Sequence, residues 1–530
     1  MSATRKLGLF DSTLLVSGSM IGSGIFLVTS DMTRQLGSGP LVLLAWLLTG
    51  VITLMAALSF GELAAMMPNA GGQYNFVTRI YGKRMGFVYG WAVFSVIQTG
   101  VIAAVAMAFA KHLGIFTWNH EKVFFSYVIF GDGECEGGTT FKLLAGQFIA
   151  IGSIFLLTLI NSLGIQEGKW IQRIFTLAKL IALSALIMGG LYVLFGGSLN
   201  GVKNYFWENM SSGASHFVPL DELNPLKPNV GSVGGTQLHE VVPQWQSLAG
   251  IGLLLAFASA MVGSLFSSDA WQGITFMSGE VENPSKTIPK ALLYGTFIVT
   301  VVYCLANLAY MAVLPLKGLN LAEAMAAVGP NGLSDNLVLG ISHADQDRVG
   351  VAASSVLMGS AQNAEAGLMG LIFMATLIIV STFGCNNGLI LAGSRLYKAM
   401  ADQGLFFKSA AKLNRKNVPA NALWMQAFWA SALCLSGTYG DLLSYCTFAS
   451  LLFYIITVAG VLILRKREPD AERPYKVWGY PYLPIIYLIV AGFVALGIIV
   501  SQFSIAITGI GIVALGWPIY SIFSRRNQST

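Results

Sequence analysis

Long apolar stretches separated by shorter polar segments run along almost the whole chain. A helix needs about 20 mostly apolar residues to cross the hydrocarbon core of a bilayer, and twelve stretches approach this length. They lie near residues 9–34, 40–66, 86–112, 143–164, 170–196, 249–278, 288–314, 366–395, 419–436, 441–464, 480–500 and 503–523. The runs are continuous rather than alternating, which predicts an all-α membrane protein and not a β-barrel.

Basic residues gather on one side of the predicted membrane. With the N-terminus in the cytoplasm, 22 of the 31 Lys and Arg residues lie on the cytoplasmic side, eight lie outside, and Lys179 falls inside the fifth span. This bias follows the positive-inside rule. We therefore expect a multi-pass protein of the cell membrane, plasma or inner, whose tails 1–8 and 524–530 are cytoplasmic.

Composition excludes several classes of protein. Of 530 residues, 55% are hydrophobic and 11% are charged, and the mean hydropathy is +0.67. Soluble domains are about 25% charged, so a soluble enzyme, a disordered chain and a nucleic-acid binder are excluded. The net charge of +6 is explained by the topology. The five Cys and five His residues form neither a disulfide scaffold nor a metal-ligand spacing, so we expect no metal, no cofactor and no catalytic centre.

Two spans contain runs of small residues that weaken a helix. These runs are Gly18–Phe26 in the first span and Gly263–Trp271 in the sixth. Interrupted spans at matching positions of two halves indicate an inverted-repeat transporter. The predicted organisation is spans 1–5 at 9–196, a long outer loop at 197–248, spans 6–10 at 249–465, and an appended pair, spans 11–12, at 480–523.

The glycines of the first run make local unwinding cheap, since each costs about 1 kcal/mol relative to Ala inside a helix. Unwinding frees N–H groups at the start of the outer half-helix, where the helix dipole favours a carboxylate. It also frees carbonyl groups of the inner half-helix, which can accept from an ammonium. A packing face built on Gly18 and Gly22 is the alternative.

Three polar residues inside spans are further candidates. Asp269 lies in the second run and could meet a substrate ammonium, take part in proton movement, or cap a half-helix. Lys179 lies on a polar stripe of the fifth span; its charge could replace a bound sodium ion by neutralising carbonyls of the first span and hydroxyls such as Ser381, or it could snorkel to an interface. Gln98 of the third span forms either a helix–helix hydrogen bond or part of a pocket.

Several motifs together resemble a known family. They are Gly18–Phe26, Gly61–Leu63 with Met67–Tyr74, Ile171–Leu180, Gly279–Pro284 with Ile288–Pro289, and Ser394–Gly404. On these motifs the chain resembles the amino acid–polyamine–organocation superfamily, and within it is similar to the L-type amino-acid transporter branch. The resemblance covers about residues 8–470 and implies a twelve-span, LeuT-type inverted-repeat fold with discontinuous first and sixth helices.

The resemblance also implies a binding site. In it the amides of Ser23, Gly24 and Ile25 would hold a substrate α-carboxylate, and Phe266 would be an aromatic gate. Lys179 would occupy the place of a sodium ion. The α-ammonium would be held by the carbonyls of Met20, Ile21, Phe266, Ser267 and Asp269.

Three positions depart from the family pattern. Asp269 stands where the family often has a small residue, and is similar to members that accept cationic amino acids and cystine. Gly273 suggests a roomier pocket. Cys135 lies in the outer loop where animal members join an accessory glycoprotein, but in a different local context, so we expect no accessory chain.

These observations predict a sodium-independent secondary transporter of amino acids that works by alternating access, through exchange or proton coupling. Neutral substrates are expected, with tolerance of cationic ones. A polyamine or amine carrier of the same fold is one alternative. A channel or a transport-like receptor is another, from a different class.

Overall fold

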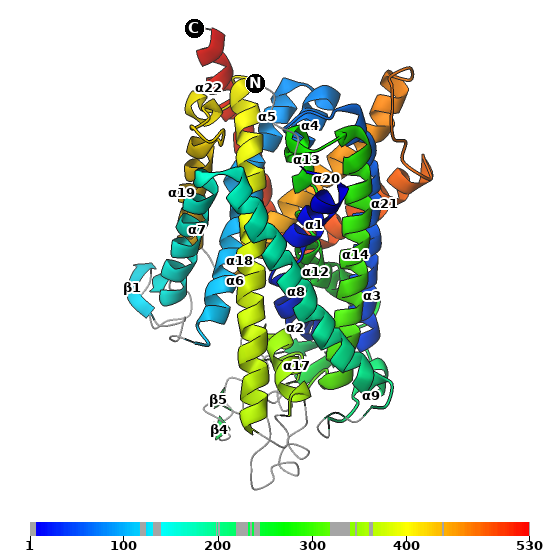
Figure 1. The fold of residues 1–530 in the computed structure, drawn as a ribbon. Helices are drawn as coiled ribbons and strands as arrows, with labels where there is room; N and C mark the ends of the chain where they lie inside the picture. Colours follow the sequence, from blue (N-terminus) through cyan, green and yellow to red (C-terminus); the bar gives the residue numbers. More distant parts are fainter. Residues whose placement is uncertain are drawn as a thin grey trace.

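The computed structural model describes residues 7–116, 123–130, 139–197, 199, 202–218, 232–233, 236–237, 244–318, 340–344, 347–359, 364–436 and 439–528. Helices run roughly parallel to one long axis, and both chain termini lie at the same end (Figure 1). The short strands lie at the opposite end, beside the connections between spans. We call these two ends the termini end and the loop end.

Helices account for every predicted span. Their bounds are α1 Leu9–Met20, α2 Gly24–Leu36, α3 Gly39–Met66, α4 Gln73–Tyr81, α5 Lys83–Ala92, η1 Val93–Ile97, α6 Gln98–Leu113, α7 Ala145–Leu163, α8 Ile165–Leu194, α9 Phe206–Met210, α12 Gly250–Ser267, α13 Gly273–Phe276, η2 Ser278–Glu280, α14 Pro284–Val313, α17 Val349–Leu357, α18 Ala364–Asp402, η4 Lys408–Ala411, α19 Ala420–Ser436, α20 Tyr439–Arg467, α21 Tyr482–Ser501 and α22 Phe503–Gln528. Within the described residues, eleven spans are long and apolar enough to cross a membrane. The predicted ninth span is α19, which has only 17 residues. The all-α membrane fold is therefore confirmed.

Both predicted interruptions are present. Helix α1 ends at Met20 and α2 begins at Gly24, so a non-helical segment separates two half-helices. Helix α12 ends at Ser267 and α13 begins at Gly273. Ala270, between them, has a φ of 68°, a left-handed conformation that a helix does not contain. The structure therefore has two breaks, which we call the first and second break.

The packing of the helices puts the breaks inside the bundle. Helix α14 packs against α1 and α3, α18 packs along α6 and α8, and α12 packs against α2. In the most apolar stretch of the first span 89% of the residues are buried inside the protein, whereas in the last span only 17% are buried. The first span is therefore central, and α22 lies at the periphery with apolar side chains left to face lipid.

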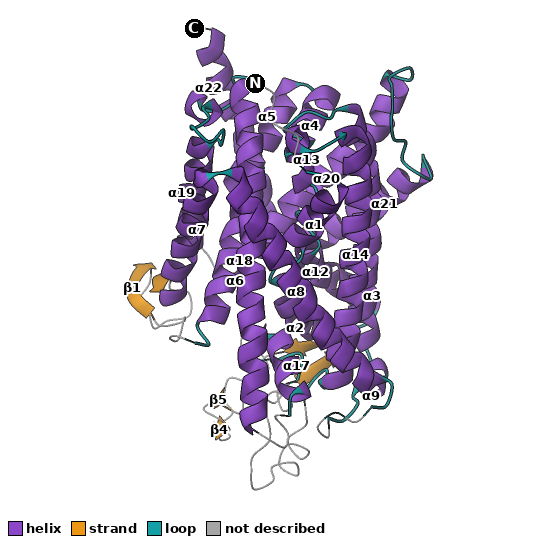
Figure 2. Ribbon diagram, viewed as in Figure 1, coloured by secondary structure: helices purple, strands orange, loops and turns teal. Residues whose placement is uncertain are grey.

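The loop end contains short strands that the apolar pattern did not predict (Figure 2). Strand β1, Val123–Phe130, pairs with β2, Thr139–Leu144. Within the long 197–248 connection, β3, Ser215–Val218, pairs with β6, Gln244–Ser247, and β4, Ser232–Val233, pairs with β5, Thr236–Gln237. The β3–β6 ribbon lies against the end of α2: a Cβ at Gly37 would come within 2.3 Å of the Ser215 hydroxyl oxygen.

Candidate substrate site

A buried lysine holds the first break. Lys179 of α8 is fully buried, and its ammonium donates to the carbonyl oxygens of Gly18 and Ile21, with 2.6 Å between Nζ and the Ile21 oxygen. The Ser381 hydroxyl of α18 lies 3.5 Å from the same Ile21 oxygen, at the limit of a hydrogen bond. The side chain of Lys179 therefore points into the bundle and does not snorkel to an interface.

The neighbouring carbonyl groups also have partners within the chain. The Cys385 thiol donates to the Ser19 carbonyl, with 3.0 Å between sulfur and oxygen. The Tyr303 hydroxyl of α14 lies 2.9 Å from the Met20 oxygen and 3.0 Å from the Ser267 oxygen. Tyr303 thus joins the C-terminal ends of α1 and α12, where the helix dipoles concentrate negative charge.

Most carbonyl groups expected to meet a substrate ammonium already accept one hydrogen bond. Ile21 accepts from Lys179, Met20 and Ser267 face Tyr303, and Phe266 accepts from the Asp269 amide at 3.1 Å. A carbonyl oxygen has two lone pairs. The Met20 and Ser267 oxygens, which share the Tyr303 hydroxyl, therefore each keep at least one lone pair for a ligand, whereas the Ile21 oxygen faces both Lys179 and Ser381.

The first turn of α2 offers unpaired donors. Within the described part of the chain, the backbone amides of Ser23, Gly24 and Ile25 have no hydrogen-bond acceptor. The first N–H groups of a helix have no partner inside it, and the dipole there favours an anion. The three amides expected to bind a carboxylate are therefore available and lie together.

Gly24 has a second role that the sequence did not reveal. A Cβ at this position would lie 2.0 Å from the Ser267 hydroxyl oxygen and 3.0 Å from the Ser267 Cα. The glycine therefore allows α2 to approach α12 closely, whether or not a ligand is bound. At Gly22 a Cβ would lie 3.1 Å from the Cys385 sulfur. Of the two glycines predicted to form a packing face, Gly18 and Gly22, Gly22 therefore lies close to α18, and the binding interpretation stays a prediction.

The second break contains a buried carboxylate. Asp269 is 8% exposed and accepts hydrogen bonds from two hydroxyl groups of α20, those of Tyr454 and Ser450, the latter at 3.2 Å. Neither donor is charged, and no ion pair of Asp269 occurs among the described residues. A buried carboxylate without a cation is costly, and these hydrogen bonds offset part of that cost.

A small cavity of about 20 Å³ adjoins this carboxylate, room for about one water molecule. It lies between α3, α12, α20 and α21. Both polar and aromatic groups line it: Ile52, Thr53, Ala56, Leu265, Ser268, Asp269, Trp271, Thr447, Ser450, Leu451, Tyr454 and Tyr487.

Three other predicted residues have different surroundings. Phe266 is 7% exposed at the end of α12, and its ring meets that of Tyr439 edge to face. Gly273 opens α13, where a Cβ would make only an ordinary 3.5 Å contact with Ala392. The Gln98 amide donates to the Leu389 carbonyl of α18 at 2.8 Å, which is a helix–helix hydrogen bond.

Besides Cys385, four residues that contact the breaks in the described part of the chain were missed by the sequence analysis. They are Tyr303, Tyr439, Ser450 and Tyr454, which contact the breaks from α14 and α20. Tyrosine in a membrane span is typical of the core and of interfacial belts. The only signal was the spacing of Ser450 and Tyr454, four residues apart, which places both on one helix face.

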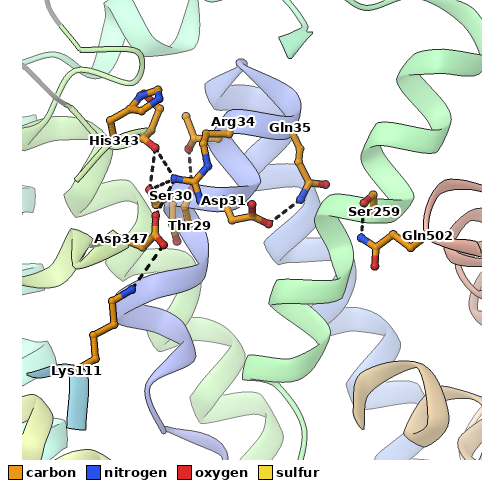
Figure 3. Close-up of polar contacts among 12 residues, drawn as sticks. Thr29, Ser30, Asp31, Arg34, Gln35, Lys111, Ser259, His343, Asp347 and Gln502 are labelled. Atoms are coloured by element: carbon orange, nitrogen blue, oxygen red, sulfur yellow. Dashed lines mark hydrogen bonds and ion pairs between the residues drawn. The ribbon is translucent and has the colours of Figure 1, made fainter. Parts of the chain in front are cut away.

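A polar cluster lies at the loop end of α2 (Figure 3). Nη1 of Arg34 donates to Asp347 Oδ1 at 2.7 Å and to the Ser342 carbonyl at 2.8 Å. Lys111, near the end of α6, places Nζ 3.7 Å from Asp347 Oδ2. Asp347 therefore bridges α2 and α6 through two cations.

Asp347 and His343, the two titratable groups of this cluster that lie outside the spans, both have shifted pKa values. Burial alone would raise the pKa of the Asp347 carboxyl, but the charges of Arg34 and Lys111 outweigh burial and hold that pKa below its usual value. Burial, reinforced by the positive charge of Arg34, lowers the pKa of His343 to about 4. Near neutral pH the cluster therefore contains an ionised Asp347 and a neutral His343.

Comparisons with known proteins agree with this geometry. A family model described as amino acid permease matches residues 7–515. The chain belongs to the amino acid permease family. The serine/threonine exchanger SteT of Bacillus subtilis is 25% identical over 530 residues, which cover 99% of this chain and 98% of SteT. The large neutral amino acids transporter small subunit 2 of Mus musculus is 26% identical, covering 97% and 80%. The b(0,+)-type amino acid transporter 1 of Mus musculus is 26% identical, covering 94% and 84%.

This membership confirms the family resemblance drawn from the motifs, and the relatives are consistent with the L-type branch. The permease is a multi-pass membrane protein. Its family and relatives are transporters rather than enzymes, and they support amino acid transport as its function. Cys135, on which the expectation about an accessory chain rested, lies outside the described residues.

Proposed function

We propose that this permease is a sodium-independent secondary transporter that moves amino acids across the cell membrane by alternating access. Spans 1–5 and 6–10 form the two inverted repeats, and both termini face the cytoplasm. The substrate binds between the two breaks. Transport proceeds by exchange or by proton coupling, and no accessory glycoprotein is required.

The observation that best supports this proposal is the contact of Lys179 with the first break. A fully buried ammonium on the Gly18 and Ile21 carbonyls supplies a fixed positive charge where the backbone is most negative. In this proposal that charge, with Ser381 beside it, does the work of a bound sodium ion. Because this positive charge is part of the chain, the first break needs no bound sodium ion, and we expect transport to be independent of sodium.

The substrate pose follows from the free donors. The carboxylate meets the amides of Ser23, Gly24 and Ile25, and the ammonium uses the remaining lone pairs of the break carbonyls. Phe266 covers the substrate, and Gly273 leaves room beside it. The substrate side chain then points towards Asp269, where a guanidinium or ammonium would neutralise the buried carboxylate, whereas a neutral side chain would leave Asp269 to its hydroxyl partners.

Ion pairs near both ends fit a mechanism that closes the site alternately. At the termini end, Arg395 Nε of α18 lies 3.1 Å from Glu280 Oε1, and Glu280 neighbours the N-terminal segment through its carbonyl, which accepts from the Leu7 amide. At the loop end, Arg34 pairs with Asp347 at 2.7 Å. The cavity at Asp269 has room for about one water molecule, so the helices around it have to move apart when an arginine side chain enters.

The test is counterflow in proteoliposomes. A thermal-shift screen of the twenty amino acids first identifies the substrate. Proteoliposomes containing the purified protein are then filled with unlabelled substrate, and radiolabelled substrate is added outside. We expect saturable uptake that is unchanged when sodium is replaced by choline. Sodium-stimulated uptake would contradict the role proposed for Lys179, and non-saturable flux would favour a channel.

Asp269 also favours a second candidate, a carrier of amines or polyamines. Such a substrate would use the buried carboxylate but has no group for the free amides of α2. Competition by a decarboxylated analogue separates the two. An amine that competes as well as its parent amino acid would support the amine carrier, and a weak competitor would support the amino acid transporter.

A further inference from the structure

Tyr439, the first residue of α20, contacts both breaks. Its hydroxyl oxygen lies 3.3 Å from the Ser23 hydroxyl oxygen, and its ring meets the Phe266 ring edge to face, with 6.1 Å between centroids and 88° between planes. Both partners are buried, Ser23 at 1% and Phe266 at 7% exposure. One side chain therefore touches the start of α2 and the end of α12.

We propose that Tyr439 is a positioning residue for the substrate carboxylate. It acts through Ser23, and the proposal rests on the proposed function of the α2 amides. A hydroxyl both donates and accepts. When the Tyr439 hydroxyl donates to Ser23, the Ser23 hydrogen is free to donate to a carboxylate beside the amides. Hydrogen bonds to a charged acceptor are stronger than neutral ones, so the orientation of this one hydroxyl affects affinity.

The ring has a separate effect from the hydroxyl. The edge-to-face contact steadies Phe266 in its place over the site, since aromatic pairs of this geometry attract beyond their buried area. Tyr439→Phe removes the hydroxyl and keeps the ring contact. Tyr439→Leu removes both. Comparing these two variants distinguishes carboxylate positioning from closure of the aromatic cover.

A double-mutant cycle with Ser23→Ala tests whether Tyr439 acts through Ser23. We expect Tyr439→Phe and Ser23→Ala each to raise KM about three- to tenfold in counterflow, the change expected from one hydrogen bond. The double variant should match Ser23→Ala alone, because the Tyr439 hydroxyl then has no partner to orient. Vmax should change less than KM.

Tyr310→Phe is the matched control. The Tyr310 hydroxyl also reaches the first turn of α2, but it donates to the Ile25 carbonyl, at 3.3 Å. Its effect should multiply with that of Ser23→Ala. Independent effects of Tyr439→Phe and Ser23→Ala, or no effect of Tyr439→Phe, would overturn the proposal. Absence of transport by the unmutated protein would instead overturn the proposed function.

The loop-end cluster supports a second, independent inference. Helix α2 begins at the first break and ends at the loop end, so a movement of α2 relative to α6 would open the site towards the loop end. Asp347 lies between them, bonded to Arg34 of α2 and paired with Lys111 of α6 (Figure 3). The geometry points to Asp347 as the centre of an electrostatic latch that holds the loop end closed.

The exposure of the latch fits repeated opening. The side chains of Arg34, Asp347 and Lys111 are 26%, 37% and 18% exposed. Ion pairs in contact with water contribute little net stability, so they can break and re-form in each transport cycle. A fully buried pair would cost far more to separate.

The reporter for the latch is Cys385, whose thiol lies at the first break. In intact cells a membrane-impermeant thiol reagent reaches it only when the loop end, outside in our topology, is open. We expect Asp347→Asn to raise the labelling rate of Cys385 about three- to tenfold. Asp347→Glu, which keeps a carboxylate between Arg34 and Lys111, should keep the slow rate. Labelling is measured by mass spectrometry of the peptide that contains Cys385.

Two controls complete this experiment. Glu208→Gln removes a different loop-end ion pair, the one with Lys203 at 2.6 Å, and should leave the labelling rate unchanged. Glu208→Cys, on an exposed site, is labelled only if the loop end faces outside, which tests the topology separately. An unchanged rate in Asp347→Asn, an equal rise in Glu208→Gln, or a rise in Asp347→Glu as large as that in Asp347→Asn would overturn the latch.

Discussion

The two breaks have opposite electrostatic character. At the first, a buried cation, Lys179, meets backbone carbonyl groups, and no carboxylate is paired with it among the described residues. At the second, a buried acidic group, Asp269, accepts hydrogen bonds from the hydroxyl groups of Ser450 and Tyr454, and no cation is paired with it among the described residues. The chain therefore balances the first break by itself and leaves the second without a positive charge.

This difference separates structure from specificity. A charge satisfied inside the chain is needed whatever substrate is bound, because removing it takes a charged donor from two buried carbonyl groups, those of Gly18 and Ile21. A charge that lacks an opposite partner discriminates among substrates, because only some of them bring one. We therefore expect mutations at the first break to affect all transport and mutations at the second to affect selectivity.

The largest expected effect is that of Lys179→Ala. It removes the positive partner of the Gly18 and Ile21 carbonyls, so uptake of every substrate should fall more than about a hundredfold, or about 2.8 kcal/mol. Lys179→Met, which keeps the length of the side chain, should fail equally if the charge is what matters. Counterflow rates measure this, with size-exclusion profiles to verify folding. Uptake preserved in Lys179→Met would mean that packing, not charge, supports the first break.

Asp269→Asn should change selectivity rather than activity. Competition of leucine uptake by arginine should weaken about tenfold to a hundredfold, about 1.4–2.8 kcal/mol, while leucine uptake itself changes little. Tyr454→Phe is the companion variant and should strengthen arginine competition, since it removes a donor that shares the carboxylate. Equal arginine competition in wild type and Asp269→Asn would mean that the second break does not select charge.

Glycine-to-alanine substitutions compare the packing of the two breaks. Gly24→Ala places a Cβ 2.0 Å from the Ser267 oxygen, and overpacking of this kind costs about 1–3 kcal/mol. Gly273→Ala makes only an ordinary contact and should be neutral. Thermal unfolding of both variants is the measurement, and Ser267→Gly should partly rescue Gly24→Ala. Equal thermal stability of Gly24→Ala and Gly273→Ala would contradict the proposed difference in packing between the two breaks.

The smallest expected effect is a pH dependence of stability, which distinguishes the loop end from the two breaks. His343 has a pKa of about 4 in the folded protein, below the ordinary value of about 6.5. Its depressed pKa contributes stability that is fully present above about pH 6.5 and declines as the pH falls towards 4, because only the unfolded chain takes up a proton in that interval. The groups that face it are Arg34, Asp347, Ser342 and Phe217.

The measurement is the thermal stability of wild type and His343→Gln between pH 7 and pH 4. The wild type should lose more stability than the variant over this interval. Asp347, whose pKa lies below its ordinary value, contributes only at the acid end of this interval, near pH 4, and does so in wild type and variant alike. Any pH dependence of uptake that survives in His343→Gln and vanishes in Asp269→Asn would then belong to the second break. Identical stability curves for wild type and His343→Gln would contradict the assignment.

The sequence predicted features whose cause is local. Span lengths follow from the bilayer, and the breaks follow from clusters of Gly and Ser in otherwise apolar helices. Lys179 stood out because a charge inside a span is rare. The short α19 and the strands at the loop end show where this logic weakens, since neither has a strong apolar pattern of its own.

Features that depend on distant segments could not be predicted. Tyr303 and Tyr454 look like ordinary aromatic residues of their spans, and only the fold places their hydroxyl groups at the breaks. Gly24 was interpreted through ligand access, because the closeness of Ser267, more than 240 positions away, is a property of packing. Gln98 received a pocket role as well, yet its amide is bonded to the Leu389 carbonyl.

Tyr303 has a further consequence that concerns the counting of hydrogens. Its oxygen lies 2.9 Å and 3.0 Å from two carbonyl oxygens, Met20 and Ser267, but a hydroxyl carries a single hydrogen. At any instant that hydrogen bonds fully to at most one of them, and the other half-helix presents an unshared acceptor to the space between the breaks. Rotation of the Tyr303 hydroxyl about its C–O bond therefore moves the unshared acceptor, the vacancy, from α1 to α12. Such rotations are many orders of magnitude faster than helix movements, so the two half-helices offer the vacancy in turn while the backbone stays still.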